Sequence, residues 1–295
     1  MIIYSIFLFI LDGKLIYEKL QSFGLEYVPI ILITVISGWG VLFVRWNILL
    51  KNQELHIPIK ENILIYLAGF ALAISPLKSG ELLKSELLKN KFNIPRTKTV
   101  PIIIMERFYD IIGTVLISII VGSFFLGISF VPIILGITAL AIGVFFILYF
   151  KSVFNFISSK IFKFKFFARF EEPLKKSQQI FHESSSKKLM ITSTSLTILW
   201  RFIEGIGIYF VLVGFGIDII GYLEIISLYS TSIILGAVSM LPAGIGVTEG
   251  SFGGLSSLLG IEISIALALA IIIRLFTLWF GVVIGFICLK LSKSL

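Results

Sequence analysis

Long apolar runs separated by short polar segments dominate this sequence. Five of the runs come close to the roughly 20 residues that an α-helix needs to cross a bilayer. They lie at residues 29–50, 99–121, 130–150, 190–215 and 263–289. The pattern predicts an all-α, polytopic integral membrane protein, and we expect residues 1–295 to form a single transmembrane domain.

Two further apolar segments are interrupted by proline. Residues 62–75 are apolar for only 14 positions before Pro76, and residues 222–241 end at Pro242. Short or broken segments of this kind are more often re-entrant than spanning, because free backbone groups at membrane depth need protein or a wet cavity around them. We therefore predict two re-entrant helical hairpins.

Charged residues follow both breaks at nearly equal spacing. Glu81 and Arg107 are 26 positions apart, and Glu249 and Arg274 are 25 positions apart. This spacing indicates a diverged internal repeat.

Glycines also follow both breaks. A helix that begins near Gly80 or Gly246 would direct backbone N–H groups at an anion, with Gly244 allowing the chain to turn. The alternative is that these prolines and glycines only kink the helices.

Basic residues are concentrated in two polar segments, which sets the expected orientation. Residues 151–188 contain nine Lys or Arg and residues 78–98 contain six, so the positive-inside rule places both in the cytoplasm. Counting crossings from these segments puts both termini in the cytoplasm and makes the hairpins enter from opposite faces. We therefore predict two inverted repeats, 29–121 and 190–289, joined by residues 122–189.

The composition of the chain argues against a nucleic-acid-binding protein, a metalloprotein and an enzyme of a common type. The chain is 57% hydrophobic with mean hydropathy +1.04, and its formal charge of +8 comes from loops rather than from a nucleic-acid surface. The single cysteine, Cys288, and two distant histidines predict no metal site, and we expect no cofactor. No phosphate-binding loop or nucleophile motif occurs, so we assign no catalytic residue and do not expect an enzyme.

Three ionisable residues lie inside the run 99–121. Glu106 and Asp110 share a helix face, and Arg107 and Asp110 are also neighbours at three positions' separation. Glu106 is the eighth residue of the run, about 12 Å deep at 1.5 Å per residue. Charges at this depth are costly, so they indicate either an internally neutralised ion pair or a site for a lipid headgroup or a proton.

Other charged positions receive structural interpretations. Arg201 and Glu204 read as a local ion pair, and Arg45-Trp46 reads as an interfacial anchor near the end of its span. Residues 81–91 predict an amphipathic helix with leucines on one side and Lys84 elsewhere. Arg274 has no carboxylate within four positions, so we expect its partner to be Glu249, Glu106 or a substrate phosphate.

These motifs resemble the lysylphosphatidylglycerol synthase transmembrane-region family, over nearly the whole chain. The resemblance rests on Pro76-x-Lys78-x-Gly80-Glu81, Glu106-Arg107-x-x-Asp110, Leu241-Pro242-x-Gly244-x-Gly246-Val247-x-Glu249 and Arg274. It implies two inverted repeats with re-entrant helices and movement of anionic or aminoacylated lipids between leaflets. Leu77 and Ala243 stand where this family often has glycine, which is expected to alter hairpin packing. The family's fused soluble aminoacyl-transferase domain is not expected here, so synthase activity is not carried over.

The resulting expectation is a cell-membrane lipid transporter or flippase for an anionic or aminoacylated phospholipid or a polyprenyl-phosphate-type lipid. The alternatives are a membrane enzyme or accessory subunit for lipid or lipid-linked glycan modification, and a purely structural partner. Expected partners are membrane lipids and no nucleic acid, with a second copy of the chain and a separate lipid-modifying enzyme as further candidates. The expected lipid-binding residues, lining one cavity between the repeats, are Lys78, Gly80, Glu81, Glu106, Arg107, Asp110, Gly244, Gly246, Glu249 and Arg274.

Overall fold

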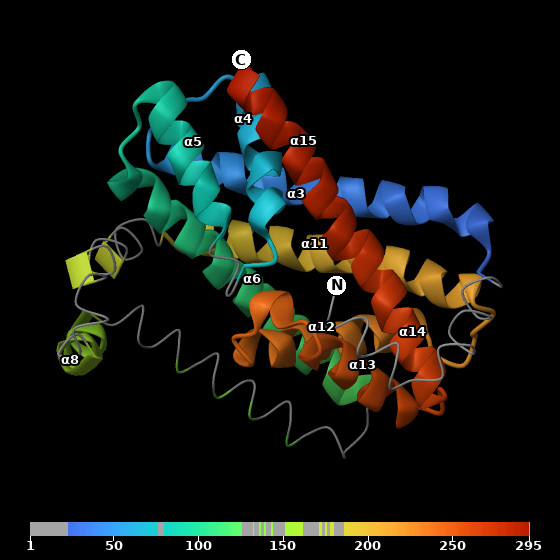
Figure 1. Ribbon diagram of the computed structural model, residues 1–295. Coiled ribbons are helices and arrows are strands. Elements are labelled where there is room, and N and C mark those ends of the chain that lie inside the picture. The colour runs from blue at the N-terminus through green and yellow to red at the C-terminus, as the bar shows by residue number, and fades with distance from the viewer. Residues whose placement is uncertain are drawn as a thin grey trace.

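A computed structural model describes residues 23–75, 80–125, 151–161 and 186–294, together with single positions between 132 and 179. All regular elements within these residues are helical, so the all-α prediction is confirmed there (Figure 1). The span expected at 130–150 lies almost entirely outside the described residues. The elements are η1 (Leu25–Tyr27), α3 (Val28–Asn52), α4 (Ile59–Ala68), η2 (Gly69–Leu72), α5 (Leu83–Phe92), α6 (Arg96–Phe125), α8 (Lys151–Ile161), α11 (Lys187–Gly214), α12 (Tyr222–Val238), η5 (Pro242–Gly244), α13 (Val247–Ser257), α14 (Ile263–Arg274), the π-helical turn η6 (Leu275–Trp279) and α15 (Phe280–Ser294).

Three helical stretches among the described residues are long and apolar enough to cross a membrane. They are Leu25–Asn52, Lys187–Gly214 and Ile263–Ser292, which match three of the predicted spans. On α3, the large apolar side chains of Ile33 and Ile36 are more than half exposed. Such exposure suits a lipid environment rather than water, and the chain is a multi-pass membrane protein.

Small residues allow the long helices to approach closely. α3 and α11 lie side by side across the molecule (Figure 1). A Cβ at Gly38 of α3 would lie 2.8 Å from the Trp200 ring of α11, and a Cβ at Gly207 of α11 would collide with Thr34. Helices packed in a membrane use small residues in this way, because close backbone approach supplies the van der Waals contact that holds them together.

The order of elements repeats along the chain. A long helix, a broken helical pair and a second long helix occur as α3, α4–η2 with α5, and α6. The same order returns as α11, α12–η5–α13, and α14 with α15. The two sets also pack reciprocally, since α4 lies against α15 and α12 lies against α6.

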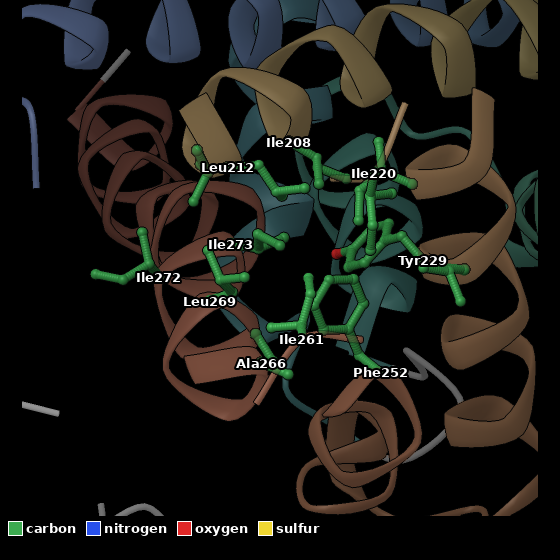
Figure 2. Packing of buried hydrophobic residues seen from close by; sticks show 14 of the residues in the cluster. Ile208, Leu212, Ile220, Tyr229, Phe252, Ile261, Ala266, Leu269, Ile272 and Ile273 are labelled. Atoms are coloured by element: carbon green, nitrogen blue, oxygen red, sulfur yellow. The ribbon is translucent and has the colours of Figure 1, made fainter. Parts of the chain in front are cut away.

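Two large clusters of buried apolar side chains hold these sets together. The C-terminal cluster joins α11, α12, α13 and α14, with Tyr229 and Phe252 packed edge to face at its centre (Figure 2). The second cluster joins α3, α4, α5 and α6 around Trp46, Tyr66 and Tyr109. The charged site described below is embedded in this second cluster.

Candidate functional site

Within the described part of the chain, six charged side chains form a closed ring in which cations and carboxylates alternate. Five of the six are buried, and only the Arg107 side chain is as much as 24% exposed. The ring contains equal numbers of positive and negative groups and joins α3, α6 and the start of α5. Its members, in order around the ring, are Arg45, Asp110, Arg107, Glu81, Lys84 and Glu106.

One half of the ring centres on Arg107. Asp110 accepts from Arg45 Nη1 at 2.7 Å through Oδ1 and contacts Arg107 Nη1 at 2.9 Å through Oδ2. The other terminal nitrogen of Arg107 lies 2.9 Å from Glu81 Oε2. Arg107 is therefore held between two carboxylates.

The other half of the ring centres on Lys84. Its ammonium lies 2.5 Å from Glu106 Oε2 and 3.2 Å from Glu81 Oε2. Arg45 Nη2 lies 4.0 Å from Glu106 Oε1 and closes the ring. The Lys84 ammonium is thus shared between the carboxylates of Glu81 and Glu106.

Aromatic rings surround the Lys84 ammonium from the apolar side. The ammonium lies 4.5 Å from the Trp46 ring centroid and 5.3 Å from that of Tyr66. Trp46 is fixed in turn, because its indole N–H donates to Asn62 Oδ1 at 2.8 Å. Cation–π contacts of this kind are strongest where water is absent, so they help to hold the buried charge.

A partly open cleft borders the Arg107 side of the ring. Its polar wall contains Glu81, Arg107 and Asp110, and its apolar wall carries four aromatic side chains. The full lining is Val35, Trp39, Leu42, Tyr66, Phe70, Ala73, Glu81, Arg107, Asp110, Trp200, Glu204, Thr277, Leu278 and Gly281. The cleft therefore lies between α3, α4, α6, α11, η6 and α15.

A mainly apolar hollow adjoins this cleft. It shares the lining residues Val35, Glu204 and Thr277 with the cleft. The rest of its wall is formed by Ile31, Gly207, Ile208, Val211, Ile273 and Phe276. The hollow is only about the size of one water molecule, so the cleft is the larger space and the hollow continues its apolar wall.

The π-helical turn η6 contributes to both spaces. It places Thr277 on the lining, and the Tyr229 and Thr277 hydroxyls are 3.1 Å apart. π-Turns inside helices are frequent at functional sites because the extra residue changes which side chains face a neighbour. Here the turn follows directly after Arg274 and contains the lining residues Phe276, Thr277 and Leu278.

The Arg201–Glu204 pair adjoins the cleft. Arg201 Nη1 lies 2.5 Å from Glu204 Oε2, and Arg201 Nε donates to Thr114 Oγ1 at 3.0 Å. The predicted local ion pair is confirmed. Glu204 also lines the cleft, a position that its sequence context did not reveal.

A second charged assembly holds the break between α12 and α13. Glu249 Oε2 accepts from the Gly246 backbone N–H at 2.7 Å, and Glu249 Oε1 accepts from Arg274 Nε at 2.9 Å. Arg274 also donates to the Ala243 carbonyl. Among the partners expected for Arg274, the structure shows Glu249, and the guanidinium clamps the chain reversal.

The clamped break contains a left-handed alanine. Ala243 has φ of 51° and ψ of 15°, and it is followed by Gly244 at φ 65° and Gly246 at φ 88°. For an L-residue with a Cβ this conformation costs about 1–2 kcal/mol. The glycine implied here by the family resemblance would therefore relieve strain.

We predict that Ala243→Gly raises the free energy of unfolding by up to about 1 kcal/mol, since relief of strain is offset by the added freedom of glycine in the unfolded chain. Thermal unfolding in detergent measures this effect. The control is Ala237→Gly, in the helical part of α12, which is expected to be destabilising. A loss of stability in Ala243→Gly as large as in the control would contradict the prediction.

The structure brings together some of the predicted site residues and separates others. Glu81, Glu106, Arg107 and Asp110 belong to one ring, whereas the cleft lining includes neither Glu249 nor Arg274. The remaining predicted residues lie elsewhere. Gly80 directly precedes the ring residue Glu81, and Gly244 and Gly246 lie at the break between α12 and α13. Lys78 lies outside the described residues.

Two members of the ring were not anticipated. The interfacial assignment of Arg45-Trp46 is wrong, because both side chains are fully buried and Arg45 reaches Asp110. The placement of Lys84 away from the buried side of α5 is also wrong, because Lys84 is buried together with Leu88, while Leu82, just before the helix, is 41% exposed. A signal for Arg45 was present: it lies seven residues before the end of α3, about 10 Å inside at 1.5 Å per residue.

The fold and the site together define a multi-pass membrane protein with a buried, charge-balanced polar centre beside a cleft. The family described as the lysylphosphatidylglycerol synthase TM region matches residues 1–285, and the chain belongs to this family. A UPF0104 membrane protein of Pyrococcus horikoshii is 26% identical over 282 residues, which cover 85% of this chain and 83% of that protein. The expected family is confirmed.

Proposed function

We propose that this protein is a lipid transporter that moves a phosphate-bearing lipid between the two leaflets of the cell membrane. The observation that carries the proposal is the cleft, which has a partly exposed guanidinium at one end and an aromatic and aliphatic extension at the other. Arg107 can bind a phosphate with two parallel hydrogen bonds, and the aromatic and aliphatic wall of the cleft suits contact with acyl or prenyl carbons. The candidate substrates are anionic or aminoacylated phospholipids and polyprenyl-phosphate-type lipids.

Inverted repeats would give this cleft access to both leaflets. The recurring order of elements and the reciprocal packing of α4 on α15 and α12 on α6 support two related halves. The predicted repeat also pairs Glu81–Arg107 with Glu249–Arg274, and both pairs form ion pairs at 2.9 Å. Transporters commonly place substrate between such repeats and expose it alternately to each side.

Cysteine labelling tests the inverted topology. In a Cys288→Ser background, we expect cysteines at His56 and Thr97, which flank the first broken pair, to react with a membrane-impermeant maleimide only from the cytoplasmic side. Cysteines at Asp218 and Glu262, which flank the second pair, are expected to react only from outside. All four positions are exposed. Opposite sides for the two members of either pair would show a true crossing and overturn the re-entrant arrangement.

Transport itself is tested in vesicles that contain the purified protein and a fluorescent phosphatidylglycerol, with dithionite added to bleach the outer leaflet. We expect Arg107→Gln to slow the lipid movement about tenfold or more, because a hydrogen bond to a charged group contributes about 1.5–3 kcal/mol. The matched control is Arg96→Gln. Arg96 begins α6, its side chain is 55% exposed, and it pairs with Glu86 of α5. It is expected to retain the wild-type rate.

The same vesicles distinguish transport from enzymatic action. Lipid extracts analysed by mass spectrometry are expected to show no covalent change after movement between leaflets. A new lipid product would favour the membrane-enzyme alternative. A wild-type protein that moves no phosphate-bearing lipid, or an Arg107→Gln variant as fast as Arg96→Gln, would contradict the proposed role of the cleft.

A further inference from the structure

The charge balance of the ring constrains what must accompany an anionic headgroup. The ring is neutral, with Arg45, Lys84 and Arg107 matching its three carboxylates. A phosphodiester that binds Arg107 adds one negative charge to a site at membrane depth, where uncompensated charge is costly. The Arg107 guanidinium cannot keep full contact with two carboxylates while it binds phosphate, so one carboxylate must lose its contact with Arg107 and its charge must be compensated in another way.

The contacts in the ring indicate that Glu81 is the carboxylate that loses its contact with Arg107. Asp110 retains Arg45 Nη1 at 2.7 Å when Arg107 turns toward the cleft. Glu81 retains Lys84, but at 3.2 Å and shared with Glu106, which holds the same ammonium at 2.5 Å. Of the three ring carboxylates, Glu81 therefore keeps the longest contact with a ring cation once Arg107 binds phosphate. It is the carboxylate that we expect to be neutralised.

Access for a proton excludes Glu106, which does not belong to the cleft lining, and leaves Glu81 and Asp110, which both do. The contacts with Lys84 and Arg45 described above then select Glu81 over Asp110. Among the residues that the structure describes, titratable or charged groups around Glu81 come from several elements. They include Tyr66 on α4, Lys84 on α5, Glu106, Arg107 and Asp110 on α6, and Glu204 on α11, which is itself neutralised by Arg201.

We infer that one proton is taken up with each anionic headgroup and is carried on the carboxylate of Glu81, so that this protein co-transports lipid anions and protons. The inference rests on the proposed function. A proton from water adds to a Glu81 carboxylate oxygen as phosphate takes its place on Arg107, and both leave when the headgroup dissociates. No covalent bond of the lipid changes, and a proton gradient would give the transport its direction.

Proton uptake on binding provides the test. The purified protein in weakly buffered detergent is titrated with dihexanoyl phosphatidylglycerol, a phosphodiester whose own charge does not change near neutral pH. Binding is followed by tryptophan fluorescence, since Trp39 and Trp200 line the cleft, and protons are followed with a soluble pH dye. We expect uptake of about one proton per bound lipid, and a Kd that rises by up to about tenfold per pH unit.

Variants separate this inference from the proposed function. Glu81→Gln is expected to bind the lipid without proton uptake and with a Kd independent of pH, whereas Glu81→Asp restores both. Glu262→Gln, at an exposed position, is the control and takes up protons like the wild type. Binding by the wild type without proton uptake, or undiminished uptake in Glu81→Gln, would overturn this inference alone. No binding at all would overturn the proposed anion site and the inference with it.

Discussion

Replacing Arg45 with methionine is expected to lower the free energy of unfolding by about 3–5 kcal/mol, the usual cost of removing one partner from a buried ion pair. Arg45 is fully buried and contacts Asp110 at 2.7 Å and Glu106 at 4.0 Å. It also donates to the Thr197 hydroxyl at 2.5 Å. Its loss leaves the ring with two cations for three buried carboxylates, and uncompensated buried charge is costly.

Unfolding in mixed micelles with increasing dodecyl sulfate measures this change. Lys51→Met is the matched control, because Lys51 lies on the same helix and is exposed. We expect the control to change stability by less than about 0.5 kcal/mol. Adding Asp110→Leu to Arg45→Met is expected to recover part of the loss, since removing both partners restores neutrality. Equal stability of Arg45→Met and Lys51→Met would show that the ring does not hold the fold together.

Replacing Arg274 with glutamine is expected to cost about 3 kcal/mol by the same physical argument applied to the second charged assembly. The substitution removes the guanidinium that neutralises Glu249 and that holds the Ala243 carbonyl at the chain reversal. The break between α12 and α13 then loses its hydrogen-bonded link to α14, while the apolar packing of α13 on α14 remains. Because the cleft lining does not include Arg274, we expect the folded fraction of this variant to bind dihexanoyl phosphatidylglycerol with wild-type affinity.

Two comparisons check the role of Arg274. The double variant Arg274→Gln with Glu249→Gln is expected to be more stable than Arg274→Gln alone, since the buried carboxylate is then neutral too. Lys290→Gln, at an exposed position of α15, is the control and is expected to match the wild type. A stable Arg274→Gln variant that no longer binds the lipid would show instead that Arg274 contacts the substrate.

Local chemistry explains why much of this architecture was predictable from sequence. Helix length follows from the length of an apolar run, and the broken pairs follow from proline and glycine, so spans such as Lys187–Gly214 and the break before Pro76 needed no tertiary information. The contact between Arg107 and Asp110 likewise follows from helical geometry at three positions' separation. The matching spacing of Glu81–Arg107 and Glu249–Arg274 also coincides with two ion pairs, each at 2.9 Å.

Tertiary structure alone decided which charges meet across the fold. Arg45 and Asp110 are 65 positions apart, and Lys84 and Glu106 are 22 apart, so nothing local identifies the carboxylate that each cation meets, even though the depth of Arg45 in its helix points away from an interfacial anchor. A long basic side chain near a helix end can extend toward the membrane surface as easily as toward a buried carboxylate. The packing of α3, α5 and α6 decides between these two directions, because it buries the Arg45 and Lys84 side chains completely and leaves the carboxylates as their available counter-charges.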